Sequence, residues 1–231
     1  MLLSVPIMQR RRSRPSHSAW RKAAIEYHDA QRQVADPAAL SLEPQFSNKC
    51  WDPIMRNWYP ASSVKAAHIL PYSMTNEVLR MILGEDEGAE VLFDMRNCLL
   101  LWEPLGAAFD KGSFVLVPVQ PPEEGRTTDY KFVLLEERRR LVKIQAPDSM
   151  TWGDLDGTIL EFRNDCRPRQ RYMYLNFASQ IIAARKLKFD QGSRTHLEST
   201  GTLTAWVSPG KWIRKSMIRE VARITAQPRG G

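Results

Sequence analysis

The runs KAAHILP at residues 65–71 and NCLLLW at residues 97–102 decide the fold of this chain. The first run is apolar and contains one histidine, His68. It ends at Pro71, which cannot donate a backbone hydrogen bond to a neighbouring strand. The second run begins at Asn97 and continues as an apolar stretch typical of a buried strand. We therefore expect two short strands, with a histidine on the first and an asparagine leading into the second.

A helix and a turn follow the second run. Residues 103–109 predict a short helix, because Pro104 stands in the first turn, where its missing N–H is tolerated. The run AFDKG at residues 108–112 then places Asp110 before a Lys-Gly turn. The order strand, histidine, long excursion, asparagine, strand and helix predicts an α+β fold with a ββα core. We expect an antiparallel sheet and flanking helices to extend this core.

The first strand, expected at residues 64–70, has two faces because side chains alternate along a strand. One face carries Ala66, His68 and Leu70, and the other carries Lys65, Ala67 and Ile69. After the strand, Thr75 is placed to cap a helix that Gly84 ends.

Hydrophobic spacing and turn residues predict the remaining elements. A helix at residues 18–34 has an apolar face that we expect to pack on the domain or on a partner, formed by Trp20, Ala24, Tyr27 and Gln31. The other helices are expected at 75–83, 88–93, 172–187 and 212–224. Further strands are expected at 114–119, 130–135, 141–145 and 159–162, with loops at 36–48 and 190–208. The chain then divides into a basic arm with a helix (1–45), a main domain (46–190), and a loop with a basic helix (191–231).

Composition bounds the classes of function. The 231 residues are 43% hydrophobic and include seven tryptophans, which is enough for a folded core. The net charge of +7 permits a polyanionic partner such as DNA or RNA. Three widely spaced cysteines favour a reducing compartment, so we expect an intracellular protein of the cytoplasm or nucleus. The sequence contains no apolar run long enough to predict a membrane span.

The two runs and the AFDKG turn resemble the HNH (ββα-metal) endonuclease domain of fungal proteins. In that family an Ala-His-Ile-x-Pro segment precedes Asn-x-Leu-Leu-Leu and then Phe-Asp-x-Gly. The resemblance extends from about residue 50 to residue 187. It implies phosphodiester hydrolysis with a divalent cation, with His68 as the general base and Asn97 holding the histidine loop.

The resemblance also indicates where the cation ligands would stand. One is the residue before the base, here Ala67, and the other lies three residues before Phe-Asp, here Gly106. Neither has a side-chain donor atom, so the chain resembles a degenerate member whose metal ligands are lost. Asp110, or Asp94 after a loop rearrangement, is left to help hold a cation, and Asp110 or Asn97 could orient His68 as an acid or base. The metal is therefore unknown, no cofactor is assigned, and Mg²⁺ or another divalent cation is expected only with residual nuclease activity.

Three functions remain open at this point. The first is a nucleic-acid-binding or weakly nucleolytic HNH-like protein. The second is an HNH scaffold reused as a metal-independent acid–base enzyme, such as a cyclase, isomerase or lyase of fungal specialised metabolism. Its small organic substrate would occupy a pocket formed by Tyr72, Trp102, Gly106 and Phe109. The third is an interaction module without catalysis, with terminal helices that also offer contacts for a homo-oligomer.

Basic residues near both ends are the candidate nucleic-acid contacts. They are Arg10, Arg11, Arg12, Lys211, Arg214 and Lys215. Clustered Lys and Arg side chains bind phosphates by charge and by counterion release, without reading the bases.

Overall fold

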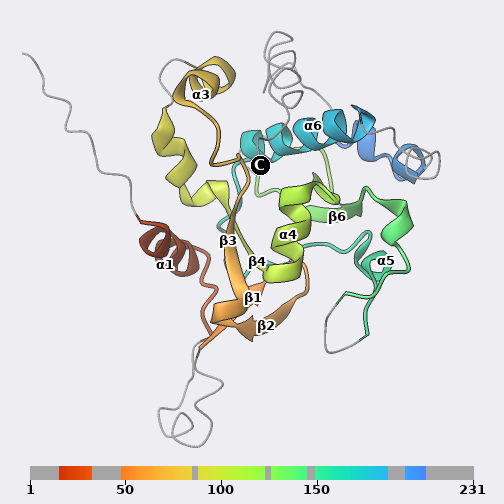
Figure 1. The fold of residues 1–231 in the computed structure, drawn as a ribbon, viewed down its shortest axis with the longest axis horizontal. Helices are drawn as coiled ribbons and strands as arrows, with labels where there is room; N and C mark the ends of the chain where they lie inside the picture. Colours follow the sequence, from red (N-terminus) through yellow and green to blue (C-terminus); the bar gives the residue numbers. More distant parts are fainter. Residues whose placement is uncertain are drawn as a thin grey trace, which may run out of the picture.

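A two-stranded antiparallel ladder forms the centre of the computed structural model (Figure 1). Strands β3 (Val64–His68) and β4 (Cys98–Trp102) pair so that Val64 lies opposite Trp102 and His68 lies opposite Cys98. Helix α4 (Glu103–Lys111) follows β4 directly and ends at Gly112, whose φ of 71° favours glycine. The structure describes residues 16–32, 48–84, 88–122, 126–144, 149–186 and 196–206.

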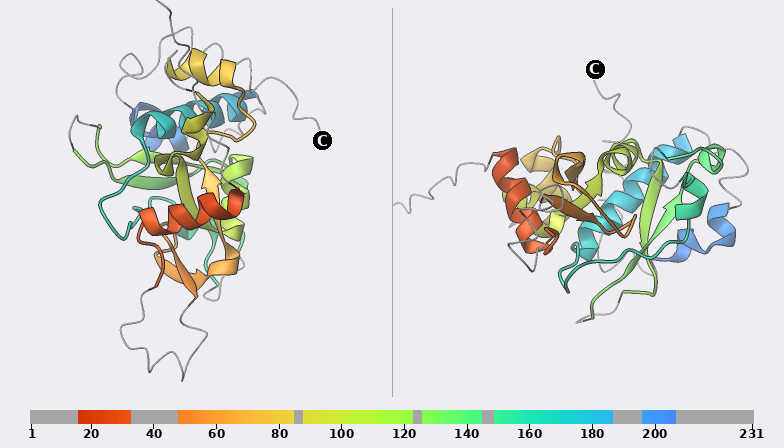
Figure 2. Two further views of the ribbon diagram at one scale, coloured as in Figure 1. Left: turned by 90° about the vertical axis from the view of Figure 1, so that its left-hand side faces the viewer. Right: turned by 90° about the horizontal axis from the view of Figure 1, so that it is seen from below.

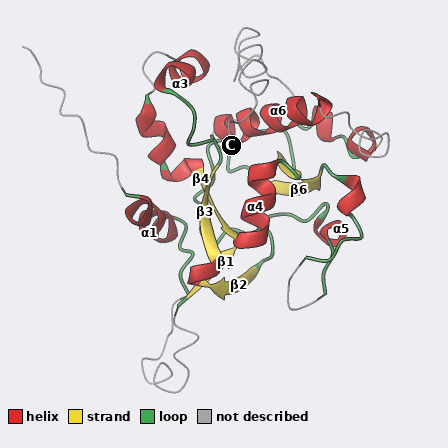
Figure 3. Ribbon diagram, in the orientation of Figure 1, coloured by secondary structure: helices red, strands yellow, loops and turns green. Residues whose placement is uncertain are grey.

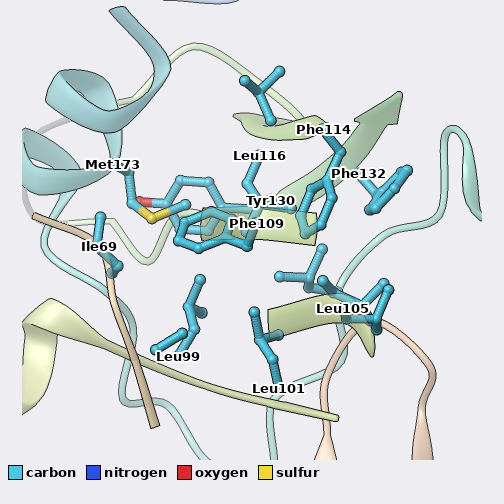
Figure 4. Packing of buried hydrophobic residues seen from close by; sticks show 14 of the residues in the cluster. Ile69, Leu99, Leu101, Leu105, Phe109, Phe114, Leu116, Tyr130, Phe132 and Met173 are labelled. Atoms are coloured by element: carbon cyan, nitrogen blue, oxygen red, sulfur yellow. The ribbon is translucent and has the colours of Figure 1, made fainter. Parts of the chain in front are cut away.

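The two faces of this ladder have different neighbours. Residues opposite each other in an antiparallel pair share a face, so Leu101 lies on the face of Lys65, and Leu99 on that of Ala67. This face meets α4 and the apolar core. Figure 4 shows the core side chains that gather there, including Ile69, Leu99, Leu101, Leu105, Phe109, Phe114, Tyr130, Phe132 and Met173. The opposite face carries His68 and Cys98 and is the face approached by α1 (His17–Tyr27).

Two more antiparallel ladders flank the centre. Strands β1 (Lys49–Asp52) and β2 (Asn57–Pro60) form one, and β5 (Phe114–Pro118) and β6 (Tyr130–Leu134) form the other. The buried carboxylate of Asp52 joins the first hairpin to β4. It accepts hydrogen bonds from the backbone N–H groups of Ile54 (2.8 Å), Met55 (2.8 Å) and Trp102 (2.6 Å). Because all three donors are backbone groups, this single side chain fixes the hairpin turn against the end of β4.

Helices surround the three ladders (Figure 3). The other α-helices are α3 (Asn76–Leu83), α5 (Trp152–Leu155) and α6 (Gln170–Lys186), and α6 packs on β5. Short 3₁₀ helices are η2 (Ala61–Ser63), η3 (Ala89–Phe93), η4 (Met95–Asn97), η5 (Glu137–Arg139) and η6 (Thr202–Thr204). The left panel of Figure 2 shows α1 lying across one side of the molecule, above the β1–β2 hairpin. None of the described helices combines the length and apolarity needed to cross a bilayer.

Several expected elements are confirmed. The strands at 98–102, 114–119 and 130–135 and the helices at 75–83 and 103–109 are present within a residue or two of their expected limits. Thr75 caps α3 by accepting the N–H of Val78. The ladder order and mixed content confirm an α+β fold with a ββα core. Trp20 and Ala24 on the apolar face of α1 are buried, as expected for packing on the domain.

Other expectations are wrong, each for a local reason. Of the strand expected at 141–145, the described residues 141–144 form none. Hydrogen bonds of η5 turn the chain there and leave Leu141 87% exposed, and among these residues only Lys143 makes a bridge, to Thr151. Residues 159–162 contribute one bridge, Ile159 to Lys131. The helix expected at 88–93 is the 3₁₀ helix η3.

Two segments nearer the ends of the chain also differ from expectation. Helix α1 ends at Tyr27 rather than near residue 34, because Gln31 instead pairs with Cys50. Within the expected loop at 190–208, the described residues 196–206 contain a helical turn and bury Leu197 and Trp206 in the core. The six basic candidates at residues 10–12, 211, 214 and 215 and the helix expected at 212–224 lie outside the described residues.

Candidate active site

His68 is the last residue of β3, and its imidazole is held from one side only. The ring hydrogen-bonds to the backbone carbonyl of Leu92. Its Nε2 is buried and has no hydrogen-bond partner within the described parts of the chain. In a neutral imidazole one ring nitrogen carries the proton and the other keeps a lone pair. With the proton on Nδ1, the unpartnered Nε2 can act as a proton acceptor.

Burial decides the charge of this imidazole. Loss of hydration lowers the pKa of His68 to about 4, and the nearby His17 adds a smaller effect in the same direction. The Leu92 carbonyl acts the other way but is outweighed. His68 is therefore neutral at physiological pH and is available as a base, not as an acid.

Asn97 immediately precedes Cys98, the residue opposite His68 in the ladder. The side chain is fully buried, and its Oδ1 accepts the N–H of Leu70 at 2.8 Å. Its Nδ2 donates at 3.2 Å to the carbonyl of Leu92, the group that also binds His68. The Asn97 carbonyl accepts the N–H of Ile69 at 3.1 Å. Asn97 thus positions the residues that follow His68 and shares an acceptor with the imidazole.

Aromatic rings surround the imidazole. The Trp20 indole stacks on His68 with 3.9 Å between ring centroids and 16° between ring planes. The rings of Tyr72 and His17 lie at centroid distances of 5.6 Å and 6.1 Å. Tyr72 in turn contacts Phe93 at 6.0 Å. Of the four residues proposed to line a pocket, Tyr72 is the one that the structure places against His68.

The other three pocket candidates and Asp110 lie elsewhere. Trp102 stands at the far end of β4, where it stacks on Tyr59 at 4.8 Å. Gly106 faces Leu101, since a Cβ added to it would meet the Leu101 Cβ at 3.9 Å. Leu101 and Cys98 are an odd number of residues apart, so Gly106 lies on the face of the ladder opposite His68.

Phe109 and Asp110 belong to α4, which packs on that opposite face. Phe109 fills the core beside Leu99 and Leu101 (Figure 4), and Asp110 is exposed on the helix. The expected pocket is therefore not assembled, because α4 and His68 are on different sides of β3 and β4. Two cavities lie away from the imidazole: one of about 200 Å³ is lined by residues 119–121 and 126–129, and one of about 20 Å³ lies beside His28.

Comparison with known families agrees with the central part of this fold. Residues 45–117 match the family model described as HNH endonuclease. The HNH-like segment contains the β1–β2 hairpin, the β3–β4 ladder and α4, and it ends within β5. It leaves α1 and the chain after residue 117 unmatched. No curated protein and no solved structure matches this chain.

The side chains at the two positions where the resemblance places cation ligands do not fit a divalent cation. The two expected ligand positions, Ala67 and Gly106, are both buried on the apolar face and have no donor atom. Across the described ranges, no group of three or more His, Cys, Asp or Glu side chains is arranged to hold a metal ion. Mg²⁺ prefers several oxygen ligands, and the side chains of Ala67 and Gly106 provide none. We therefore derive no step that depends on a bound cation.

Two residues important for this site were not identified as such from the sequence. Trp20 was assigned to a packing face, which is correct, but nothing in its spacing indicates that it covers His68. Asn176 on α6 donates its Nδ2 to the carbonyl of Ile69 at 2.9 Å and so holds the residue after the histidine from the other side. A polar residue in the apolar run of a helix was the available signal for Asn176.

Proposed function

We propose that the protein is directed at nucleic acid through its HNH-like segment, with His68 as the central group and without a protein-bound cation. The match of residues 45–117 to HNH endonucleases carries this proposal. The geometry supports it, because a neutral imidazole is held beside Asn97 at the end of the first strand of a ββα unit. The net charge of +7 favours a polyanionic partner.

His68 supports one chemical role in hydrolysis. Its Nε2 lone pair can accept a proton from the attacking water or hydroxyl as that oxygen approaches phosphorus. The Leu92 carbonyl favours the imidazolium that forms. A pKa of about 4 makes it a weak base. We therefore expect binding to dominate, with slow phosphodiester hydrolysis at most.

Salt-dependent binding tests the proposal. Fluorescence anisotropy with labelled DNA and RNA should give a logarithm of affinity that falls linearly with the logarithm of salt concentration. Replacement of Arg10, Arg11 and Arg12 by Ala should lower the slope by about 3 if all three contact phosphates. Hydrolysis of the same oligonucleotides should be lost in His68→Gln, with binding retained. Absence of binding to both polymers at low salt would reject the proposed function.

A second candidate is a metal-independent acid–base enzyme acting on a small organic molecule. The observation in its favour is the buried, unpartnered Nε2 of His68 among the rings of Trp20, Tyr72 and Phe93, as seen within the described residues. Such surroundings suit an aromatic or apolar substrate rather than a phosphate. Saturation-transfer NMR with a set of aromatic small molecules should detect ligands that bind wild type and lose affinity in His68→Gln. Equal binding to both proteins would remove this candidate.

A further inference from the structure

Helix α1 covers His68, although it lies outside the HNH-like segment. The Trp20 ring lies parallel to the imidazole at 3.9 Å, which is van der Waals contact between two flat rings. The indole N–H also donates to the carbonyl of Phe93 at 3.2 Å, and Trp20 is only 2% exposed. Any other planar group that approached this face of His68 would have to occupy the volume of the indole.

The two ends of α1 are attached very differently. Near its C-terminal end, Asn164 donates to the carbonyl of Tyr27 at 2.8 Å. The residues that follow are held by His28, whose Nε2 lies 3.3 Å from the Met95 carbonyl, and by Ala30, whose carbonyl accepts the N–H of Trp51 at 2.8 Å. This end is therefore fixed to three other segments of the chain.

The N-terminal end of α1 is attached, within the described residues, through side chains. Ser16, His17, Ser18 and Ala19 are exposed, although the His17 ring lies 5.3 Å from that of Tyr72. Trp20 donates to the carbonyl of Phe93, and Arg21 donates to the carbonyls of Ala61 and Val64. The ends of a helix open more readily than its centre. Release of these side chains would let the first turns withdraw while the backbone attachments of the C-terminal end stay in place.

We propose that the first turns of α1 form a displaceable cover and that Trp20 occupies the binding site of an unstacked nucleobase on His68. The vacated place offers the flat face of a neutral imidazole and the Phe93 carbonyl, which now accepts the indole N–H. A nucleobase provides both a π face and N–H donors, and it reaches such sites from single strands or by flipping out of a duplex. This inference rests on the function proposed above and specifies the access step and the ligand class of the same site.

Chemical modification of the four histidines tests the cover directly, without relying on activity. Diethyl pyrocarbonate acylates neutral, accessible imidazoles, and peptide mass mapping gives a rate for each residue in the full-length protein. Trp20→Ala should raise the rate at His68 at least about tenfold, which corresponds to about 1.4 kcal/mol of lost protection. His196, which contacts Arg140 and Asp156 rather than α1, should react at one rate in all variants. His28 is 6% exposed and should stay protected, which reports that the fold is intact.

Matched variants of α1 separate uncovering from general damage. Arg21→Ala loosens the second attachment without opening the core, and it should also speed modification of His68. Lys22→Ala, whose side chain is 81% exposed, should have no effect. If the reactivity of His68 were unchanged in both Trp20→Ala and Arg21→Ala while His28 stayed protected, the proposal that α1 covers His68 would be refuted.

Adenine serves as the ligand probe. It should slow modification of His68 in Trp20→Ala while leaving His196 unaffected. If His68 becomes reactive but adenine gives no protection, the nucleobase assignment is overturned. If adenine protects while neither DNA nor RNA binds the wild-type protein, the inferred site stands and the wider function proposed above fails, so the two failures are distinguishable.

Discussion

Replacement of Asn97 by Ala measures how strongly the histidine loop is fixed. The variant removes an acceptor 2.8 Å from the buried N–H of Leu70 and a donor 3.2 Å from the carbonyl of Leu92. A buried N–H without an acceptor costs about 1–3 kcal/mol, whereas the Leu92 carbonyl keeps its bond to His68 and loses about 0.5–1.5 kcal/mol. We expect the free energy of unfolding to fall by about 2–4 kcal/mol.

Urea denaturation followed by tryptophan fluorescence and far-ultraviolet circular dichroism provides the assay. The midpoint should decrease while the slope with urea stays constant, which indicates lost stability rather than a changed native state. Asn76→Ala is the matched control, because Asn76 is exposed at the start of α3, and it should change stability by less than about 0.5 kcal/mol. If Asn97→Ala differed from wild type by no more than that control, the side-chain hydrogen bonds would not be what fixes this loop.

Three further predictions concern stability. Burial lowers the pKa of His68 from 6.5 to about 4, so the unfolded chain binds more protons in this range and the histidine's contribution is lost as pH falls from about 6.5 to 4. In His68→Gln, the decrease in the free energy of unfolding between pH 6.5 and 4 should be smaller by about 1–2 kcal/mol, after allowance for the partial exposure of the ring. A pH profile equal to that of wild type would refute the assigned burial. Asp52→Asn places an amide donor against one of three backbone N–H groups and should cost about 2–4 kcal/mol by urea denaturation, whereas the exposed Asp29→Asn should cost almost nothing. His196→Ala removes the 2.9 Å contact with Asp156 and should accelerate amide hydrogen exchange in residues 196–206, while exchange in β3 and β4 stays unchanged.

The sequence predicts the centre of the fold well because strong local signals coincide there. Pro71 ends the first run, Thr75 caps a helix, and an uninterrupted apolar stretch predicts the buried β4. It predicts the weaker strands poorly. A strand is expected at residues 141–145, but at the described residues 141–144 the preceding 3₁₀ turn and its backbone hydrogen bonds determine the path of the chain.

The candidate site is harder to predict from the sequence than the fold. His68 and Asn97 could be placed together because a recurring motif relates them. The pocket could not be predicted, because membership of one face depends on the register between β3 and β4, and an offset of one residue exchanges the faces. That register places Gly106 and Phe109 with the core and leaves His68 to meet Trp20, a residue far away in the sequence.

The carbonyl of Ile69, immediately after His68, is held by Asn176 from α6, a helix that begins more than fifty residues beyond the end of the HNH-like segment. Transplanting residues 45–117 into another protein would therefore carry the histidine but leave behind both Asn176 and Trp20. Sequence exchange between relatives would have to move all three parts together to preserve the geometry at residue 68. The matched segment therefore lacks two of the residues that fix the geometry around His68.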